Sequence, residues 1–92
     1  MDAYSRFADV PEDQLQQVGS NADAAKIVAL MEADLRAHPN AWENTDLATF
    51  LGALARCIDA QPQLYGNLGQ SYPAIPSWKQ FAEALVAATG YE

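Results

Sequence analysis

Residues 44–58, NTDLATFLGALARCI, decide the fold class of this chain. Asn44 or Thr45 is expected to cap a helix at the front of the stretch, where Asp46 favours the positive end of the helix dipole. Five large apolar residues then recur at helical spacing: Leu47, Phe50, Leu51, Leu54 and Ile58. The stretch therefore predicts an amphipathic helix, and its small residues, such as Ala53, would let another helix approach closely.

Residues 60–76, AQPQLYGNLGQSYPAIP, contain no Asp, Glu, Lys or Arg. Pro62 is expected to end the preceding helix, because proline lacks the backbone N–H that a helix interior needs. Long loops in compact domains are usually either functional or disordered, and the apolar side chains of this segment argue against disorder. We therefore predict a long ordered loop over residues 60–76.

A second amphipathic helix is predicted before the opening stretch. Ser20 is expected to cap it, with Asp23 completing a variant of the capping box, and Pro39 ends it. Its apolar residues also recur at helical spacing: Ala24, Ile27, Val28, Met31 and Leu35. Glu32 and Arg36 are expected to pair on the opposite face.

A third amphipathic helix is predicted near the C-terminus. Ser77 and Gln80 match the capping box, in which two side chains bond reciprocally to two backbone N–H groups. The predicted apolar face of this helix has five members: Trp78, Phe81, Ala82, Leu85 and Val86.

The N-terminal part of the chain is expected to be less regular. Residues 1–9 are predicted to be frayed, and Pro11 with the acids behind it starts a short helix that Gly19 ends. Strand patterns are absent, since branched residues do not alternate over more than a few positions. The predicted fold class is all-α: residues 1–92 form a small single-domain bundle of three main helices, with a short N-terminal helix and the long loop before the last helix.

The chain carries 12 acidic and 5 basic residues among 92, for a net charge of −7. Binding to nucleic acid or to anionic membranes is disfavoured because both need clustered Lys and Arg, whereas a basic protein partner would be attracted. The single cysteine, Cys57, excludes a disulfide within the chain. No apolar run approaches the ~20 residues of a membrane helix, and the N-terminus lacks a signal-peptide pattern, so a cytoplasmic location is expected.

No group of residues has the pattern of a catalytic or metal site. Glu43 and Asp46 are close in sequence, but solvation and helix capping account for both. His38 is the only histidine and has no partners at ligand spacing, and Cys57 is expected to be a buried structural thiol. We therefore expect no catalytic residue, no metal, no cofactor and no enzymatic activity. A small enzyme would need a carboxylate pair such as Glu43 with Glu92.

The aromatic and polar residues of the uncharged segment are the candidates for binding, because Tyr and Trp are favoured anchors of protein interfaces. With nearby acids they form the predicted partner-binding set: Tyr65, Asn67, Gln70, Tyr72, Glu43, Asp46 and Asp59. Structural roles are expected for six residues: Trp42, Asn44, Thr45, Ser77, Trp78 and Phe81. Trp42 is predicted to pack against the last helix near Trp78 or Phe81, while the Asn44 amide ties down the backbone of the loop.

Two groups of motifs stand together in the sequence. The first is WENTDL at residues 42–47, continued by FL and AL; the second combines Y-x-N-x-GQ at residues 65–70, PSWK-x-FA at residues 76–82 and a final YE. Over residues 18–92 the chain thereby resembles a family of small bacterial proteins of unknown function, with typical motifs WEN-x-x-L, YY-x-N-x-GQ, PSWK-x-[FL]A and a closing YE. The resemblance implies a small α-helical bacterial protein, but the family brings no established activity from which a function could be inferred.

The chain departs from this family pattern in two places. Gly66 stands where the second tyrosine of the loop motif is usual, and residues 55–59 lack a tryptophan that the family usually carries late in the helix. If the loop contacts a partner, these differences suggest a different partner.

Two functional hypotheses follow. The first is a non-enzymatic cytoplasmic bacterial protein that binds another protein, most concretely an immunity protein or inhibitor that neutralises a basic toxin or effector. Small acidic proteins of this kind often act in this way, which is an analogy of size and charge. The alternative is a small-molecule-binding or regulatory domain, whose loop at residues 60–76 closes a pocket over Trp42 and Trp78. The sequence indicates neither the oligomeric state nor the identity of the partner.

Overall fold

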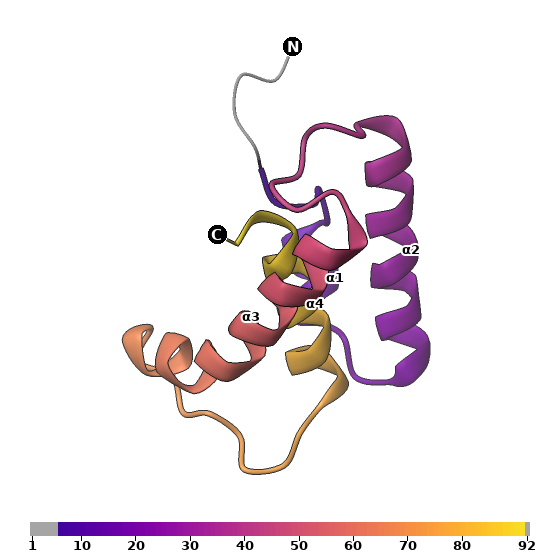
Figure 1. Cartoon of the computed structure of the whole chain (residues 1–92). Helices are drawn as coiled ribbons and strands as arrows, with labels where there is room; N and C mark the ends of the chain where they lie inside the picture. The colour runs from indigo at the N-terminus through magenta and orange to yellow at the C-terminus, as the bar shows by residue number, and fades with distance from the viewer. Residues whose placement is uncertain (1–5, 92) are drawn as a thin grey trace.

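The computed structural model describes residues 6–91, which form four helices and no extended strand. The helices are α1 (Glu12–Gln16), α2 (Asn21–Ala37), α3 (Leu47–Asn67) and α4 (Trp78–Gly90) (Figure 1). An isolated backbone bridge joins Arg6 to Trp42. The predicted all-α class is confirmed, with three main helices and a short leading one.

Helix α4 lies at the centre of the bundle. It packs against α3, α2 and α1, whereas α2 and α3 pack against α4 rather than against each other. Figure 1 shows α2 on one side, α3 crossing on the other, and α4 between and behind them. The facing sides of α2 and α3 are therefore not buried by direct packing between these two helices.

Small side chains make the contact between α3 and α4. Ala53 and Cys57 of α3 are 0% and 1% exposed in a core cluster shared with α4. Small residues let two helix axes approach closely, and the larger residues must then point elsewhere. Much of the predicted apolar stripe of α3 consequently faces away from α4. Phe50 and Leu54 pack partly against the shared cluster, whereas Leu47, Leu51 and Ile58 are 72%, 52% and 45% exposed.

The stripe of α2 lies mostly inside the protein. Ala24, Ile27 and Met31 are buried in the larger core cluster, which also contains Trp42. Val28, at the edge of the stripe, is 45% exposed. The Glu32–Arg36 pair on the outer face is confirmed, with an N–O distance of 2.9 Å.

Two of the predicted helix caps are confirmed and one is wrong. Ser20 accepts a hydrogen bond from the N–H of Asp23, and Ser77 forms the complete capping box with Gln80. The cap of α3 is Asp46, which accepts from the N–H of Thr49 at 2.9 Å, and neither Asn44 nor Thr45 has this role.

Asn44 instead binds the C-terminal end of α4. Its side-chain amide donates to the carbonyl oxygens of Ala88 and Tyr91 at 2.8 and 2.7 Å, and its backbone N–H donates to that of Thr89 at 3.0 Å. These carbonyls would otherwise lack intrahelical partners. Asn44 is therefore structural, as predicted, but it ties down α4 rather than the loop, and Thr45 is exposed.

The prediction that Pro62 ends the helix is wrong. Helix α3 continues through Pro62 to Asn67, so residues 60–67 of the predicted loop are helical and the connection to α4 comprises residues 68–77. Proline removes one hydrogen bond and crowds the preceding turn, and in Figure 1 the last turns of α3 run in a different direction from the first. Side-chain bonds to α4 hold these turns: Gln61 donates to the carbonyl oxygen of Gln80 at 2.7 Å, and the Tyr65 hydroxyl donates to Glu83.

The prediction of a frayed segment at residues 1–9 is wrong for residues 6–9, and residues 1–5 lie outside the described part. The Arg6 N–H donates to the carbonyl oxygen of Ala41 at 2.7 Å, and the N–H of buried Ala8 donates to the Thr89 hydroxyl at 2.8 Å. The Phe7 ring lies so close to Gly90 that a Cβ atom there would come within 2.6 Å of it. Residues 6–9 are thus packed against the end of α4.

Candidate protein-binding groove

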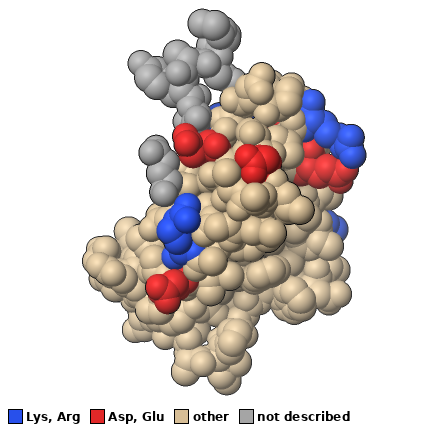
Figure 2. Space-filling model, in the orientation of Figure 1, with Lys and Arg blue, Asp and Glu red and all other residues tan. Residues whose placement is uncertain are grey.

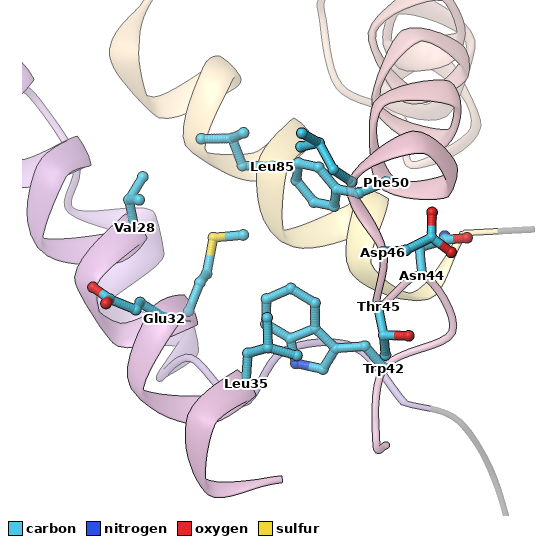
Figure 3. Close-up of a pocket in the computed structure, with 11 residues that line it drawn as sticks. Val28, Glu32, Leu35, Trp42, Asn44, Thr45, Asp46, Phe50 and Leu85 are labelled. Carbon is cyan, nitrogen blue, oxygen red and sulfur yellow. The ribbon is translucent and has the colours of Figure 1, made fainter. Parts of the chain in front are cut away.

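A groove with apolar walls lies between α2 and α3. Helix α2 contributes Val28, Met31 and Leu35, and α3 contributes Leu47 and Phe50. The cavity between them has a volume of about 390 Å³. Figure 3 shows Val28 and Leu35 on the α2 side and Phe50 on the α3 side of this cavity. We call this feature the apolar groove.

Trp42 and Leu85 complete the apolar groove. Leu85 comes from α4, which lies beneath both walls, and Trp42 closes the end near the loop that joins α2 to α3 (Figure 3). The Trp42 and Phe50 rings lie 6.5 Å apart between centroids and are tilted by 34°. Since most of its lining is large and apolar, the groove is suited to apolar side chains rather than to a polar metabolite.

Four polar residues line the groove, of which Asn44 and Thr45 are neutral and two are acidic. Glu32 of α2 and Asp46 at the start of α3 line it, and both residues are exposed. Arg36 pairs with Glu32, so one of these charges is partly neutralised, and Asp46 also caps α3.

The orientation of Trp42 is fixed by a buried carboxylate. Asp34 accepts hydrogen bonds from the indole N–H of Trp42 at 2.8 Å and from two guanidinium nitrogens of Arg6 at 2.8 and 2.9 Å. The N–H of Asp9 donates to it as well, at 3.1 Å. The hydrogen bonds from Arg6, supported by those from Trp42 and Asp9, hold the pKa of Asp34 well below its ordinary range despite its burial. This charged centre joins α2, residues 6–9 and the Trp42 end of the groove.

The exposed face of α3 continues the apolar surface beyond the groove. Leu51 and Ile58 lie on the same helical stripe as Leu47, because they follow it by four and eleven positions, close to whole helical turns. Figure 2 shows the side on which α3 is at the front, and most of this surface carries neither acidic nor basic residues. Exposed leucine and isoleucine side chains close together on such an uncharged surface are typical of interaction sites.

A second cavity, of about 510 Å³, lies among α1, α3 and α4. Its lining is mixed, with polar groups from Tyr65, Gln70, Lys79 and Glu83 beside leucines and alanines. Burial, and then the Glu83 carboxylate that accepts its hydrogen bond, raise the pKa of Tyr65 to about 12. Tyr65 therefore remains a neutral hydrogen-bond donor to α4 at physiological pH.

The predicted partner-binding residues do not form one surface. Tyr65 and Tyr72 lie edge to face, with centroids 5.1 Å apart, and the Tyr72 hydroxyl donates to the buried Gln61 side chain at 3.0 Å. Asn67 and Gln70 are exposed at this end of α3. The acids lie elsewhere: Glu43 and Asp46 before α3, and Asp59 in its middle. At 1.5 Å per residue, Tyr65 and Asp46 are about 28 Å apart along the helix.

The predicted structural role of Trp42 agrees with its burial, but the predicted neighbours are wrong. Trp42 is 7% exposed and lies near Phe50 and Leu85, whereas Trp78 and Phe81 are 49% and 44% exposed. These two aromatic residues pair with each other at 6.4 Å between centroids. They were expected inside because they continue the apolar spacing of α4, but the bundle buries Ala82, Ala84 and Ala88 of that helix instead.

The residues considered for chemistry remain separate. Cys57 is buried, and this burial raises the pKa of its thiol. His38 is exposed at the C-terminal end of α2. Within residues 6–91 no three His, Cys, Asp or Glu residues are grouped closely enough to hold a metal ion. The same residues contain no helix with the length and apolar character needed to cross a membrane. Glu92, the second member of the hypothetical carboxylate pair, lies outside the described residues.

The apolar groove was not predicted from the sequence. Val28, Leu35 and Leu47 belong to predicted apolar stripes, and such stripes ordinarily belong to a core. One feature of the sequence could have pointed to the groove: α2 and α3 carry apolar stripes of the same spacing. Two such stripes can cover each other only if the two helices are adjacent.

The chain was compared with models of known protein families. A family model described as a family of unknown function (DUF7660) matches residues 20–92. The chain belongs to this family. The resemblance predicted over residues 18–92 is therefore confirmed. No curated protein and no solved structure matches the chain.

Proposed function

We propose that this member of the DUF7660 family is a non-enzymatic protein of the bacterial cytoplasm that acts by binding another protein through the apolar groove. The observation that carries the proposal is the exposure of large apolar side chains along the groove and its α3 wall. Leu47 and Leu51 are 72% and 52% exposed, and Val28 on the opposite wall is 45% exposed. Desolvating such side chains would contribute on the order of 25 cal/mol per Å² of apolar surface covered.

A matched pair of variants tests this proposal. Leu47 at the groove and Leu68 beyond the C-terminal end of α3 are 72% and 73% exposed. Leu47→Glu and Leu68→Glu should therefore leave folding equally unaffected, which circular dichroism and thermal melting check. The bait is the tagged chain, and the prey is the product of the neighbouring gene, the most direct candidate partner.

Capture of that product by the wild type and by Leu68→Glu, with loss of capture by Leu47→Glu, supports the proposal. Failure to bind the product, or equal capture by Leu47→Glu, contradicts it. A more specific version makes the partner a basic toxin or effector that this chain neutralises. It predicts that the partner's toxicity in cells is suppressed by the wild type and by Leu68→Glu but not by Leu47→Glu.

A second candidate function, the binding of a small molecule, draws on the second cavity. Its volume of about 510 Å³ lies within the range of ligand sites, and Tyr65, Lys79 and Glu83 offer convergent polar groups. The cavity uses part of the 60–76 segment but neither tryptophan. A thermal-shift screen with amino acids, nucleotides and organic acids tests it, because a ligand of the folded state raises the melting temperature. The shift should disappear in Lys79→Met and persist in Lys26→Met, and an unshifted melting temperature throughout the panel would contradict this function.

A further inference from the structure

The two helices that form the walls of the apolar groove each carry apolar side chains at the spacing of helices that pack side by side, and part of each series lines the groove. On α2 the residues are spaced by four, three and four positions: Ala24, Val28, Met31 and Leu35. On α3 the same spacing recurs: Leu47, Leu51, Leu54 and Ile58. Steps of three and four positions place side chains along one side of a helix, where a neighbouring helix can pack against them. Within residues 6–91 no further helix covers Leu47, Leu51 and Ile58 of α3, which are exposed, whereas Leu54 packs partly against the cluster shared with α4.

The occupant of this groove must be recognised through its side chains. The groove walls are helices, whose backbone N–H and C=O groups are already bonded within each helix. No sheet edge is therefore offered to which an extended peptide could add as a strand. The cavity of about 390 Å³ has room for anchoring side chains but not for a whole helix. A helix lying across its mouth, with apolar residues inserted between Val28 and Leu47, fits both facts.

Charge favours a basic occupant. The groove is lined by the exposed acids Glu32 and Asp46, and the chain has a net charge of −7. Arg36 offsets only Glu32, which leaves Asp46 to attract a cation at the start of α3. Lys or Arg side chains on the flanks of a guest helix would meet these carboxylates, as flanking charges do in coiled coils.

Charge also disfavours a second copy of this chain. Two copies would each bring a net charge of −7 to the interface. If their α3 stripes paired in antiparallel fashion, with Leu51 opposite Leu54, then Asp46 would face Asp59. Like charges placed opposite each other reduce affinity.

We propose that the apolar groove takes one amphipathic helix of a partner protein, with apolar residues at heptad spacing and Lys or Arg along its flanks. The guest completes a bundle with α2, α3 and α4. This inference rests on the proposed protein-binding function and specifies the chemistry of the partner.

Synthetic peptides of about three heptads test the inference. The first has Leu at the heptad core positions and Lys at the flanking positions, the second replaces Lys by Glu, and the third has the first one's composition in an alternating, strand-like order. The chain has two tryptophans, Trp42 and Trp78. In the variant Trp78→Phe, tryptophan fluorescence therefore comes from Trp42 alone and reports directly on the groove. Leu47→Glu and Leu51→Glu are combined with this background, and Leu68→Glu is the matched control.

The Lys helix should shift Trp42 emission and bind at least tenfold tighter than the Glu helix at low salt, with a smaller difference at high salt. Leu47→Glu and Leu51→Glu should weaken binding at least tenfold, and Leu68→Glu should not. The inference is overturned if the Glu peptide or the strand-like peptide binds as tightly as the Lys helix. It is also overturned if Leu47→Glu leaves the binding of the Lys helix intact. A dimer in sedimentation that Leu51→Glu dissociates also overturns it, because a second copy then fills the groove.

Failure of the inference is distinguishable from failure of the proposed function. If none of the peptides binds while the product of the neighbouring gene is captured in a Leu47-dependent way, the partner chemistry is wrong and the proposed function remains. If neither binds, both are overturned.

Discussion

The apolar stripes of α2 and α3 have the same spacing along the sequence, but α4 covers the first and leaves much of the second open to solvent. In α2, Ile27 and Met31 are 1% and 5% exposed, whereas in α3 Leu47 and Leu51 are 72% and 52% exposed. The difference arises at α4, which meets α3 chiefly through the buried Ala53 and Cys57, with Leu54 only partly buried beside them. An amphipathic pattern thus identifies a face that will be covered, but not whether the cover belongs to the same chain.

The largest expected effect is at the tryptophan that joins the buried stripe to the groove. Trp42→Ala should lower the free energy of unfolding by about 3–5 kcal/mol, since it removes a buried aromatic ring and a hydrogen bond to Asp34. Trp78→Ala, at a ring that is 49% exposed, should cost roughly 1 kcal/mol or less. Urea denaturation of both variants provides the measurement. A small loss for Trp42→Ala, with loss of partner capture, would assign Trp42 to binding rather than to the core.

A direct test of the comparison uses one residue from each stripe. Ile27→Ala should cost about 2–4 kcal/mol because it leaves a cavity in the core, while Leu47→Ala should change stability by less than about 0.5 kcal/mol. Both values come from the same chemical denaturation experiment. Similar losses at the two positions would mean that α3 buries its stripe in solution, and the groove would then be closed.

The charged centre at Asp34 offers a further test of the difference between the α2 and α3 sides, since it holds Trp42 and residues 6–9 on the α2 side. Asp34→Asn should lower stability by about 2 kcal/mol at pH 7, because Arg6 and Trp42 lose an ionised acceptor. The pKa of Asp34 is depressed in the folded state. Its contribution is therefore present above the pKa of the unfolded carboxyl, about 4, and is lost as the pH falls below that value toward the folded pKa.

Denaturation at a series of pH values checks this prediction. The difference between wild type and Asp34→Asn should be constant above pH ~5 and should shrink below pH ~4. Asp59→Asn, at an exposed position of α3, is the control and should show no such dependence. A difference that grows as the pH falls would contradict the assignment.

The smallest expected effect concerns Pro62, which lies inside α3 and has no counterpart within α2. Pro62→Ala restores an N–H for the carbonyl oxygen of Ile58 and removes a steric clash, while increasing the entropy of the unfolded chain. We expect a net stabilisation of about 1 kcal/mol, measured by thermal and urea denaturation. If the variant is instead destabilised, the change of direction in α3 is needed to bring Tyr65 to Glu83.

Local features were predictable from sequence where neighbouring residues suffice to form them. The cap at Ser20 and the capping box at Ser77 involve residues only three positions apart, and both form. The variant box predicted at Ser20 does not close, because Asp23 accepts from the N–H of Gly19. The α3 cap was missed because Asn44, a suitable cap residue, is occupied by the carbonyls of α4, which leaves Asp46 to bond Thr49. The loop prediction at Pro62 failed for a similar reason, since bonds from Gln61 and Tyr65 to α4 extend the helix past a residue that locally opposes it.

The candidate site was predictable only in part. Asp46 was named as a partner-binding residue and does line the apolar groove, whereas Tyr65 and Tyr72 lie at the other end of α3 and hold the connection to α4. The sequence contains every apolar residue of the groove, but their spacing is equally that of an ordinary core.

The sequence by itself determined the helical class, the start of most helices and the acidic charge, because these follow from spacing and composition along the chain. Its motifs also carry the resemblance to a family of unknown function. The tertiary structure decided which stripe is covered, since helix axes approach most closely where their side chains are smallest. Ala53 and Cys57 of α3 meet α4 there, and Leu47, Leu51 and Ile58 are left on the outside. This packing between helices that are distant in sequence creates the apolar groove.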